Sequence, residues 1–157
     1  MQFTLQQTLD ATPQALFDVI SDPRRRHEWQ SSLESVNVMT EGPARLGTRW
    51  SERVRGGLTF ELEITEFERP RRWAERGLGR AADAELRVSF EPAPGTHDST
   101  SLRTLISLAV EIQFKGMFKW AAPVVRVLMP IALSADLRRA AALARDSRKA
   151  DLARDEK

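Results

Sequence analysis

The stretch LRTLISLAVEIQFK, Leu102–Lys115, decides the fold of this chain. From Leu102 to Phe114 its even-numbered positions are apolar except for Thr104, and most of its odd-numbered positions are polar. Because successive side chains of a β-strand point to opposite faces, this pattern predicts a strand with one apolar and one solvated face. Thirteen residues at about 3.3 Å each give a length of roughly 40 Å, well above the usual strand length. A strand this long is expected to curl, with the apolar segment after Phe118 lying in the curl as a helix.

Three further segments, residues 48–54, 58–64 and 84–90, keep their apolar side chains in the same even-numbered register. A three-residue loop at Arg55–Gly57, with a glycine in the left-handed conformation, places the first two segments on one face of a hairpin. This loop predicts three cross-strand pairs: Val54 with Leu58, Glu52 with Phe60, and Trp50 with Leu62. Residues 73–78 predict a short strand before the third segment.

Two short helices are expected after a first strand at residues 3–9. Thr12 followed by Pro13 is typical of a helix N-cap with proline in the first turn, and Asp22-Pro23 ends this helix. Residues 24–29 predict a second helical turn that folds Trp29 back onto the body.

The C-terminal part predicts one long helix from about Met117 to Arg148. Pro123 and Pro130 are expected to bend it rather than end it, because the apolar spacing continues through both. The element order therefore predicts an α+β fold, with a curved antiparallel sheet of about seven strands around this helix. Residues 1–148 are expected to form one domain and residues 149–157 a charged tail that frays.

Composition argues against several classes of function. The net charge is +2, with 24 basic and 22 acidic residues, so nucleic-acid binding has no global electrostatic support. No cysteine is present, which removes disulfides, thiolate nucleophiles and zinc–thiolate sites. The two histidines, His27 and His97, do not build a metal centre by themselves, and both are expected at the surface. No metal and no cofactor is predicted.

The most apolar stretch of the chain, Trp120–Ala135, has 16 residues and contains Arg126 and two prolines. It is expected to be too short and too interrupted to span a bilayer. Met1–Gln6 show no secretory signal. A cytoplasmic location without integral membrane association is therefore predicted, and the oligomeric state is left open.

A concave sheet face backed by a helix predicts a largely apolar cavity of roughly a few hundred Å³. The alternative for the same residues is an ordinary filled core. The candidate ligand-binding residues are Trp50, Glu52, Phe60, Leu62, Trp73, Leu86, Val88, Thr104 and Ile106 on the strands, with Val124, Val127, Leu128 and Ile131 on the helix.

Two polar residues stand out in the apolar register. Glu52 either orients a ligand hydroxyl or moves a proton, or it lies near the open end of the sheet and reaches water or an arginine. Thr104 either lines the cavity or bonds to the backbone. The pattern leaves open which way Trp73 and Glu75 point. The run Arg24–Arg26 is interpreted as a solvated surface, because no aromatic residues are interleaved with it.

Several stretches together resemble a known family. They are Ala11–Pro23 followed by Trp29, Leu46–Trp50, and Ile64–Arg72, and they look like segments of the polyketide cyclase/dehydrase branch of the START-like helix-grip (SRPBCC) superfamily. The similarity covers residues 1–145. It implies a ligand held between the concave sheet face and the long helix. Members of the superfamily include cyclases, lipid carriers and coenzyme Q-binding proteins, so the fold is implied more strongly than the activity.

The favoured function is therefore binding or transport of a small hydrophobic ligand such as a lipid, an isoprenoid or a polyketide-like molecule. One alternative is a polyketide aromatase/cyclase-type enzyme that uses the same cavity, and another is a protein-interaction module. The absence of tyrosine and cysteine leaves few acid–base groups, which favours binding over catalysis.

Overall fold

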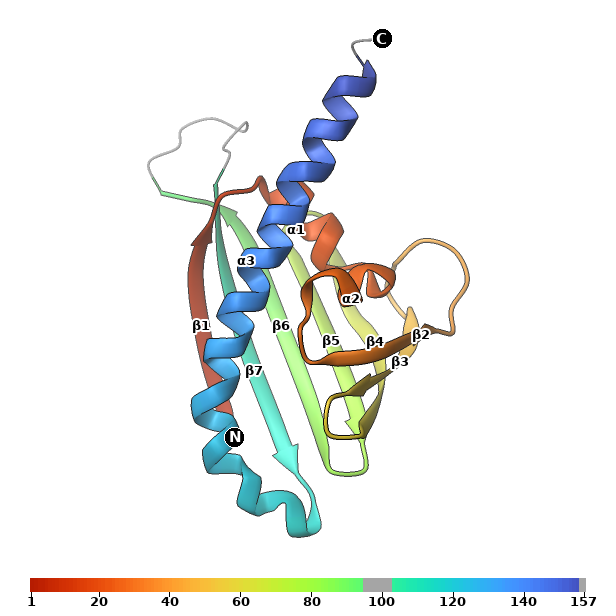
Figure 1. The fold of residues 1–157 in the computed structure, drawn as a ribbon, viewed down its shortest axis with the longest axis vertical. Coiled ribbons are helices and arrows are strands. Elements are labelled where there is room, and N and C mark those ends of the chain that lie inside the picture. Colours follow the sequence, from red (N-terminus) through yellow and green to blue (C-terminus); the bar gives the residue numbers. More distant parts are fainter. Residues whose placement is uncertain (95–102, 156–157) are drawn as a thin grey trace.

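The computed structural model describes residues 1–94 and 103–155 and contains one curved antiparallel sheet of seven strands (Figure 1). The order across the sheet is β1-β7-β6-β5-β4-β3-β2. The strands are β1 (Gln2–Leu9), β2 (Leu33–Val38), β3 (Arg49–Val54), β4 (Leu58–Glu68), β5 (Arg72–Gly79), β6 (Ala82–Pro92) and β7 (Thr104–Phe114). β7 is the long strand expected from the sequence, and it pairs with both β1 and β6. Leu102 and the predicted surface position of His97 lie outside the described residues.

The register of the β3–β4 hairpin is the predicted one. Val54 pairs with Leu58, Glu52 with Phe60 and Trp50 with Leu62, and both loop glycines have positive φ. Arg49 lies opposite Glu63 on the outer face. The three-residue loop thus keeps the apolar side chains of both strands on the concave face of the sheet.

An irregularity in β4 between Ile64 and Glu66 changes which positions face inward. Beyond it, odd-numbered Phe67 pairs with Trp73, while Ile64 pairs with Glu75. Directly paired residues share a face, so Trp73 and Glu75 both point to the concave side, where they are buried. Their direction, which the sequence left open, is thereby decided by one extra residue in the neighbouring strand.

The two short helices lie on the concave side of the sheet. α1 (Pro13–Ile20) begins with Thr12, whose Oγ1 accepts a hydrogen bond from the Ala15 N–H at 3.3 Å. It buries Phe17, whose ring meets those of Phe67 and Phe90 edge-on at centroid distances of 5.2 and 5.3 Å. A 3-10 turn, η1 (Pro23–Arg25), and α2 (Arg26–Trp29) follow and bury Trp29. Both helical predictions are confirmed.

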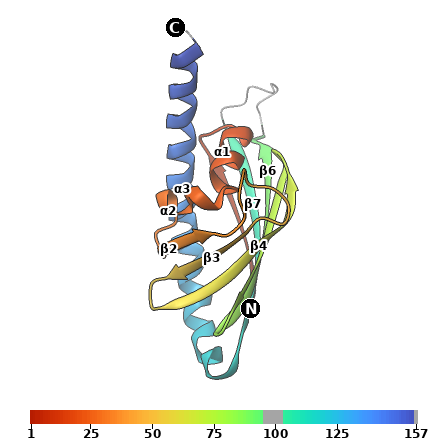
Figure 2. The ribbon, with the colours of Figure 1, turned by 90° about the vertical axis from the view of Figure 1, so that its right-hand side faces the viewer.

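The C-terminal helix begins later and runs further than its sequence pattern predicts. A 3-10 segment, η2 (Gly116–Ala121), precedes α3 (Ala122–Asp155), which continues through Pro130. Figures 1 and 2 show α3 on the same side of the sheet as α1 and α2, with its C-terminal end projecting beyond the sheet. Apart from the adjoining η2, its most extensive contacts are with α1, α2 and β1. Small buried residues, Ala140, Ala141 and Ala144, allow this close packing. This is the helix-grip fold.

Candidate functional site

The strand residues predicted to bind a ligand come together on the concave face, but most of them lie within the packed core. Trp50, Leu62, Trp73, Val88 and Ile106 are buried in one hydrophobic cluster with α1 and the C-terminal half of α3. Leu86 and Phe60 are half-buried at its border. The part of the expected cavity that lies next to α1 and the C-terminal half of α3 is therefore filled by side chains of the protein itself. A ligand-binding role for these residues stays a prediction.

Thr104 is fully buried and is held by the backbone. Its hydroxyl donates a hydrogen bond of 2.7 Å to the carbonyl oxygen of Ala11, which follows β1. Of the two interpretations of Thr104, the structure supports the backbone-bonded one.

The position predicted for the four helix residues is wrong. Val124, Val127, Leu128 and Ile131 are 53%, 64%, 58% and 66% exposed, so they do not back a cavity. Val125 and Leu133 of α3 face inward instead and pack against a second cluster, formed by Ala82, Val110 and Ile112. Both faces of this half of the helix are apolar, so its periodicity does not select the buried one. The buried face of α3 can be recognised only further along the helix, where Leu137, Ala140 and Ala144 lie on it.

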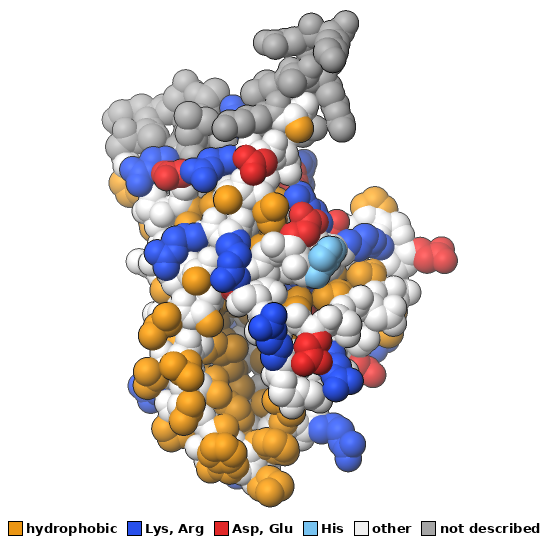
Figure 3. Space-filling view, in the orientation of Figure 1, with side chains coloured by type: hydrophobic (Ala, Val, Ile, Leu, Met, Phe, Trp, Pro, Cys, Tyr) orange, Lys and Arg blue, Asp and Glu red, His pale blue; other side chains and the backbone are white. Residues whose placement is uncertain are grey.

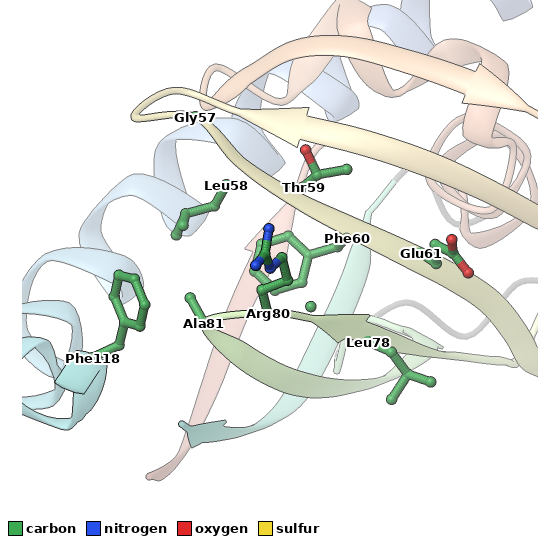
Figure 4. Close-up of a pocket in the computed structure, with 10 residues that line it drawn as sticks. Gly57, Leu58, Thr59, Phe60, Glu61, Leu78, Arg80, Ala81 and Phe118 are labelled. Carbon is green, nitrogen blue, oxygen red and sulfur yellow. The ribbon is translucent and has the colours of Figure 1, made fainter. Parts of the chain in front are cut away.

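A pocket of about 860 Å³ opens at the end of the sheet where the hairpin tips and η2 meet (Figure 4). Its lining residues are Gly57, Leu58, Thr59, Phe60, Glu61, Leu78, Gly79, Arg80, Ala81 and Phe118. Of the thirteen predicted ligand-binding residues, only Phe60 is among them. Figure 4 shows Phe118 of η2 across the pocket from Leu58 and Ala81 at the hairpin tips.

The other lining residues were not predicted from the sequence, although the positions of certain glycines indicate where they lie. In an up-and-down antiparallel sheet, the β3–β4 turn, the β5–β6 turn and the end of β7 all lie at one end. Gly56-Gly57, Gly79-Arg80-Ala81 and Gly116 mark these three points in the sequence. Chain reversals with small residues at a common end leave room between them, and the apolar residues beside them line that room.

The position of the Phe60 ring in the pocket wall depends on a glycine. A Cβ added to Gly79 would lie 2.7 and 2.8 Å from ring atoms of Phe60, its partner on β4. These distances are shorter than any carbon–carbon contact tolerates. The absence of a side chain at position 79 therefore lets the Phe60 ring lie across β5 and form part of the pocket wall.

Deeper on the same concave face lies a buried cluster of three charged residues: Arg26, Glu52 and Glu75, each at most 6% exposed. The Arg26 guanidinium forms a two-pronged ion pair with Glu75, in which Nη2 donates to Oε1 at 3.1 Å and Nη1 donates to Oε2. Its Nε lies 3.3 Å from Glu52 Oε2 and donates to Gln30 Oε1 at 3.0 Å. The Arg26 guanidinium is thus the shared counter-charge of the Glu52 and Glu75 carboxylates.

Aromatic rings enclose this cluster. The Trp50 indole N–H donates to Glu52 Oε2 at 3.3 Å, and the Arg26 guanidinium lies 5.4 Å from the centroid of the Trp50 ring. The Trp29 ring lies 6.0 Å from the same guanidinium. The cation–π contacts stabilise the buried guanidinium, and the low dielectric of the core strengthens its attraction to the two carboxylates.

The cluster changes the protonation of its members. Burial raises the pKa of Glu75 above its ordinary value, and the nearby Arg26 opposes this only in part. Burial lowers the pKa of Arg26, but the carboxylates of Glu52 and Glu75 outweigh it and the net pKa is raised. Arg26 is therefore a fixed cation, and Glu75 holds a proton more readily than an ordinary glutamate does.

The sequence interpretation of Arg24–Arg26 as a solvated run is correct for Arg24, which is exposed, and wrong for Arg26. Residues three apart share a helix face, so a turn that folds Trp29 onto the body also turns Arg26 inward. Glu52 reaches an arginine, as one interpretation expected, but it does so in the buried core and not in contact with water at the open end of the sheet. His27 is exposed, as predicted.

The cluster and the pocket are neighbours along the strands. Glu52 pairs directly with Phe60, which places their Cα atoms about 5 Å apart. Glu75 is four residues from Gly79 on β5, a distance of roughly 13 Å. Within residues 1–94 and 103–155, no group of three or more His, Asp or Glu side chains is placed to hold a metal ion.

Comparisons with known proteins agree with the fold. The fold is similar to that of the protein TTHA0849 from Thermus thermophilus, with a TM-score of 0.72 and 16% identity over 94% of this chain and 99% of that one. Ara h 8.0201 has a TM-score of 0.67 at 14% identity, with 93% and 98% covered.

The hypothetical protein jhp0584 from Helicobacter pylori has a TM-score of 0.74 at 15% identity, with 92% and 88% covered. At these identities the likeness concerns the fold alone. No curated protein matches the chain. A family model matches residues 1–145, and the chain therefore belongs to the family described as polyketide cyclase / dehydrase and lipid transport.

Proposed function

We propose that this protein binds a small hydrophobic molecule, such as a lipid, an isoprenoid or a polyketide-like compound, in the pocket at the open end of the sheet. The observation that carries the proposal is the pocket itself, with Leu58, Phe60, Ala81 and Phe118 as an apolar lining. Its volume of about 860 Å³ lies within the range of small-molecule sites. The family description, which includes lipid transport, supports the same class of ligand.

Burial of the ligand would supply the affinity. Removing about 300 Å² of apolar surface from water is worth about 7.5 kcal/mol before the costs of association. Arg80 lines the pocket and forms no ion pair among the described residues. We therefore place the polar end of the ligand, such as a carboxylate or a carbonyl group, beside Arg80 and its apolar body against Phe60 and Phe118. Thr104 has no part in this arrangement, because its hydroxyl is bonded to Ala11.

A cyclase-type activity is the second candidate, and Glu75 is the observation that favours it. A carboxyl whose pKa is raised by burial keeps its proton to a higher pH than an ordinary glutamate, which suits it to act as a general acid. A substrate in the pocket would have to extend roughly 13 Å along β5 to reach it. An enzyme that used Glu75 in this way would lose turnover and keep its ligand affinity in the variant Glu75→Gln.

Native mass spectrometry of the purified protein tests the binding proposal. We expect an additional mass of a small organic molecule on the folded protein, released on denaturation. The variant Leu58→Asp puts a carboxylate in the pocket lining and should lose this mass. Leu46→Asp changes a leucine that is 63% exposed on the loop before β3, so it should keep the mass. An unliganded wild-type protein that also takes up no added fatty acid or polycyclic aromatic compound contradicts the proposal.

The cytoplasmic location stays a prediction.

A further inference from the structure

One end of the molecule exposes an unusual number of large apolar side chains. Met117, Phe118 and Trp120 of η2 and Val124, Val127, Leu128, Met129 and Ile131 of α3 are all at least 36% exposed; Met117 reaches 78% and Trp120 73%. We call these eight residues the apolar ridge. Figure 3 shows hydrophobic side chains gathered over this half of the helix, whereas charged side chains are interspersed over the other half. Single exposed apolar residues are ordinary, but a contiguous group of this kind marks an interaction surface.

The charges along the ridge are all of one sign. From Ile112 to Ala135 the sequence contains no aspartate or glutamate, and it contains Lys115, Lys119 and Arg126. Lys115 pairs with Asp83 at 2.6 Å. Lys119 and Arg126 are exposed and form no ion pair within the part of the chain that the structure describes. The surface therefore offers apolar side chains together with unpaired positive charge, which complements a partner that is both apolar and anionic.

We propose that the apolar ridge docks the protein on the surface of a membrane that contains anionic lipids. Helical segments with this combination lie in the interface, with their apolar side chains at the headgroup–acyl boundary and their cations near the phosphates. A tryptophan such as Trp120 favours this interface because its ring is apolar and its N–H is polar.

The rest of the helix decides between lying on the membrane and crossing it. By length and composition alone, the helical stretch Gly116–Arg148 is apolar enough to cross a bilayer, contrary to the expectation drawn from the shorter Trp120–Ala135. Its C-terminal half, however, is part of the core, with Leu137, Ala140 and Ala144 at most 1% exposed. Crossing would remove these side chains from α1 and the sheet. Surface docking leaves the fold intact.

Docking would also bring the pocket to the membrane. Phe118 belongs to the ridge and to the pocket lining, so the pocket opens beside the residues that would enter the interface. The docking proposal does not depend on the proposed function, because vesicle binding is measured on the protein without added ligand.

Tryptophan fluorescence with lipid vesicles tests the proposal. Trp29, Trp50 and Trp73 are at most 4% exposed, so a spectral change on adding vesicles reports on Trp120. We expect a blue shift and co-sedimentation with vesicles of phosphatidylcholine containing about 30% phosphatidylglycerol, and weaker binding to phosphatidylcholine alone. The double variant Leu128→Glu/Ile131→Glu should bind anionic vesicles at least about tenfold more weakly. Lys119→Ala/Arg126→Ala should lose the preference for anionic vesicles.

Leu46→Glu is the matched control, since it alters an equally exposed leucine away from the ridge and should bind like the wild type. Circular dichroism checks that each variant is folded. The proposal is overturned if the wild type stays in the supernatant with both kinds of vesicle, or if the ridge double variant still binds. It is also overturned if sedimentation equilibrium shows a dimer that the double variant abolishes while vesicles bind neither protein, because the ridge is then a self-association surface.

Discussion

Arg26 and Glu75 lie 49 positions apart in the sequence and form a two-pronged ion pair inside the core, with Arg26 Nη2 3.1 Å from Glu75 Oε1. The pair ties the short helix α2 to the middle of β5. Because Glu52 of β3 shares the same guanidinium, Arg26 holds two strands of the curved sheet to one helix.

Replacing Arg26 by methionine should be strongly destabilising. Methionine fills much of the same volume but leaves two buried carboxylates without a counter-charge, which costs about 3–5 kcal/mol of the free energy of unfolding. Urea denaturation measures this loss. Arg24→Met changes the exposed neighbour and should cost less than about 0.5 kcal/mol. An Arg26→Met protein within about 1 kcal/mol of the wild type would mean that the cluster is not held by its charges.

The stability of the fold should depend on pH through Glu75. Burial raises the folded-state pKa of Glu75 above the ordinary value of 4.5, so the folded state binds the proton more tightly than the unfolded state. The stabilisation from this proton is therefore fully present below pH 4.5 and is lost as the pH rises through the raised pKa. The loss amounts to about 1.4 kcal/mol for each pH unit that separates the folded-state pKa from the unfolded-state pKa.

The variant Glu75→Gln removes this titration and keeps an oxygen that accepts from Arg26. The difference in unfolding free energy between wild type and Glu75→Gln should therefore move in favour of the variant as the pH rises from about 4 to about 8. Urea titrations across this range measure the difference. A difference that is constant, or that moves in favour of the wild type, contradicts the assignment of the raised pKa to Glu75.

Adding one methyl group at Gly79 should disturb the pocket. The new Cβ would meet the Phe60 ring at 2.7 Å and the carbonyl oxygen of Ala82 at 2.9 Å, and the second of these is backbone. We expect Gly79→Ala to cost about 1–3 kcal/mol and to move the ring into the pocket. Gly77→Ala is the comparison, since its Cβ would meet only the flexible Leu62 side chain closely, at 3.3 Å. Equal losses for the two variants would show that Phe60 yields without cost.

Thr104→Val should weaken the fold and leave ligand binding unchanged. The substitution removes the hydroxyl that bonds to the buried carbonyl of Ala11, which costs about 1–3 kcal/mol. Thr8→Val, at an exposed position on β1, should cost less than about 0.5 kcal/mol. If Thr104→Val keeps its stability and loses affinity for a hydrophobic probe, the assignment of Thr104 to the core is wrong.

The structure of the sheet can be predicted from the sequence wherever the alternation of apolar and polar residues fixes the strand register. In β7 and in the β3–β4 hairpin, alternation and the position of two glycines leave one register that puts the even-numbered apolar residues of these strands on the concave face. The direction of Trp73 and Glu75 does not follow, because it depends on one extra residue between Ile64 and Glu66, and nothing in the composition of that segment marks the irregularity.

The site is less accessible from the sequence than the fold. The apolar stripe Val124, Val127, Leu128 and Ile131 has the spacing of a buried helix face, yet it is exposed because the opposite face is apolar as well. The burial of Arg26 does not follow from the sequence, because Arg26 belongs to a run of three arginines in which Arg24 is exposed. The pocket depends on loop ends from three parts of the chain, and their meeting is a tertiary property. Burial of charge and the choice between two apolar faces are decided by neighbours distant in sequence.

Titration with a neutral hydrophobic dye, N-phenyl-1-naphthylamine, tests most directly whether the pocket binds apolar molecules. Its fluorescence should rise to saturation with one site per wild-type chain. The affinity should be nearly unchanged in Leu128→Glu, outside the pocket, and at least about tenfold weaker in Leu58→Asp, a loss of about 1.4 kcal/mol. Saturable binding that Leu58→Asp leaves intact, or the absence of saturable binding to the wild type, would contradict the account.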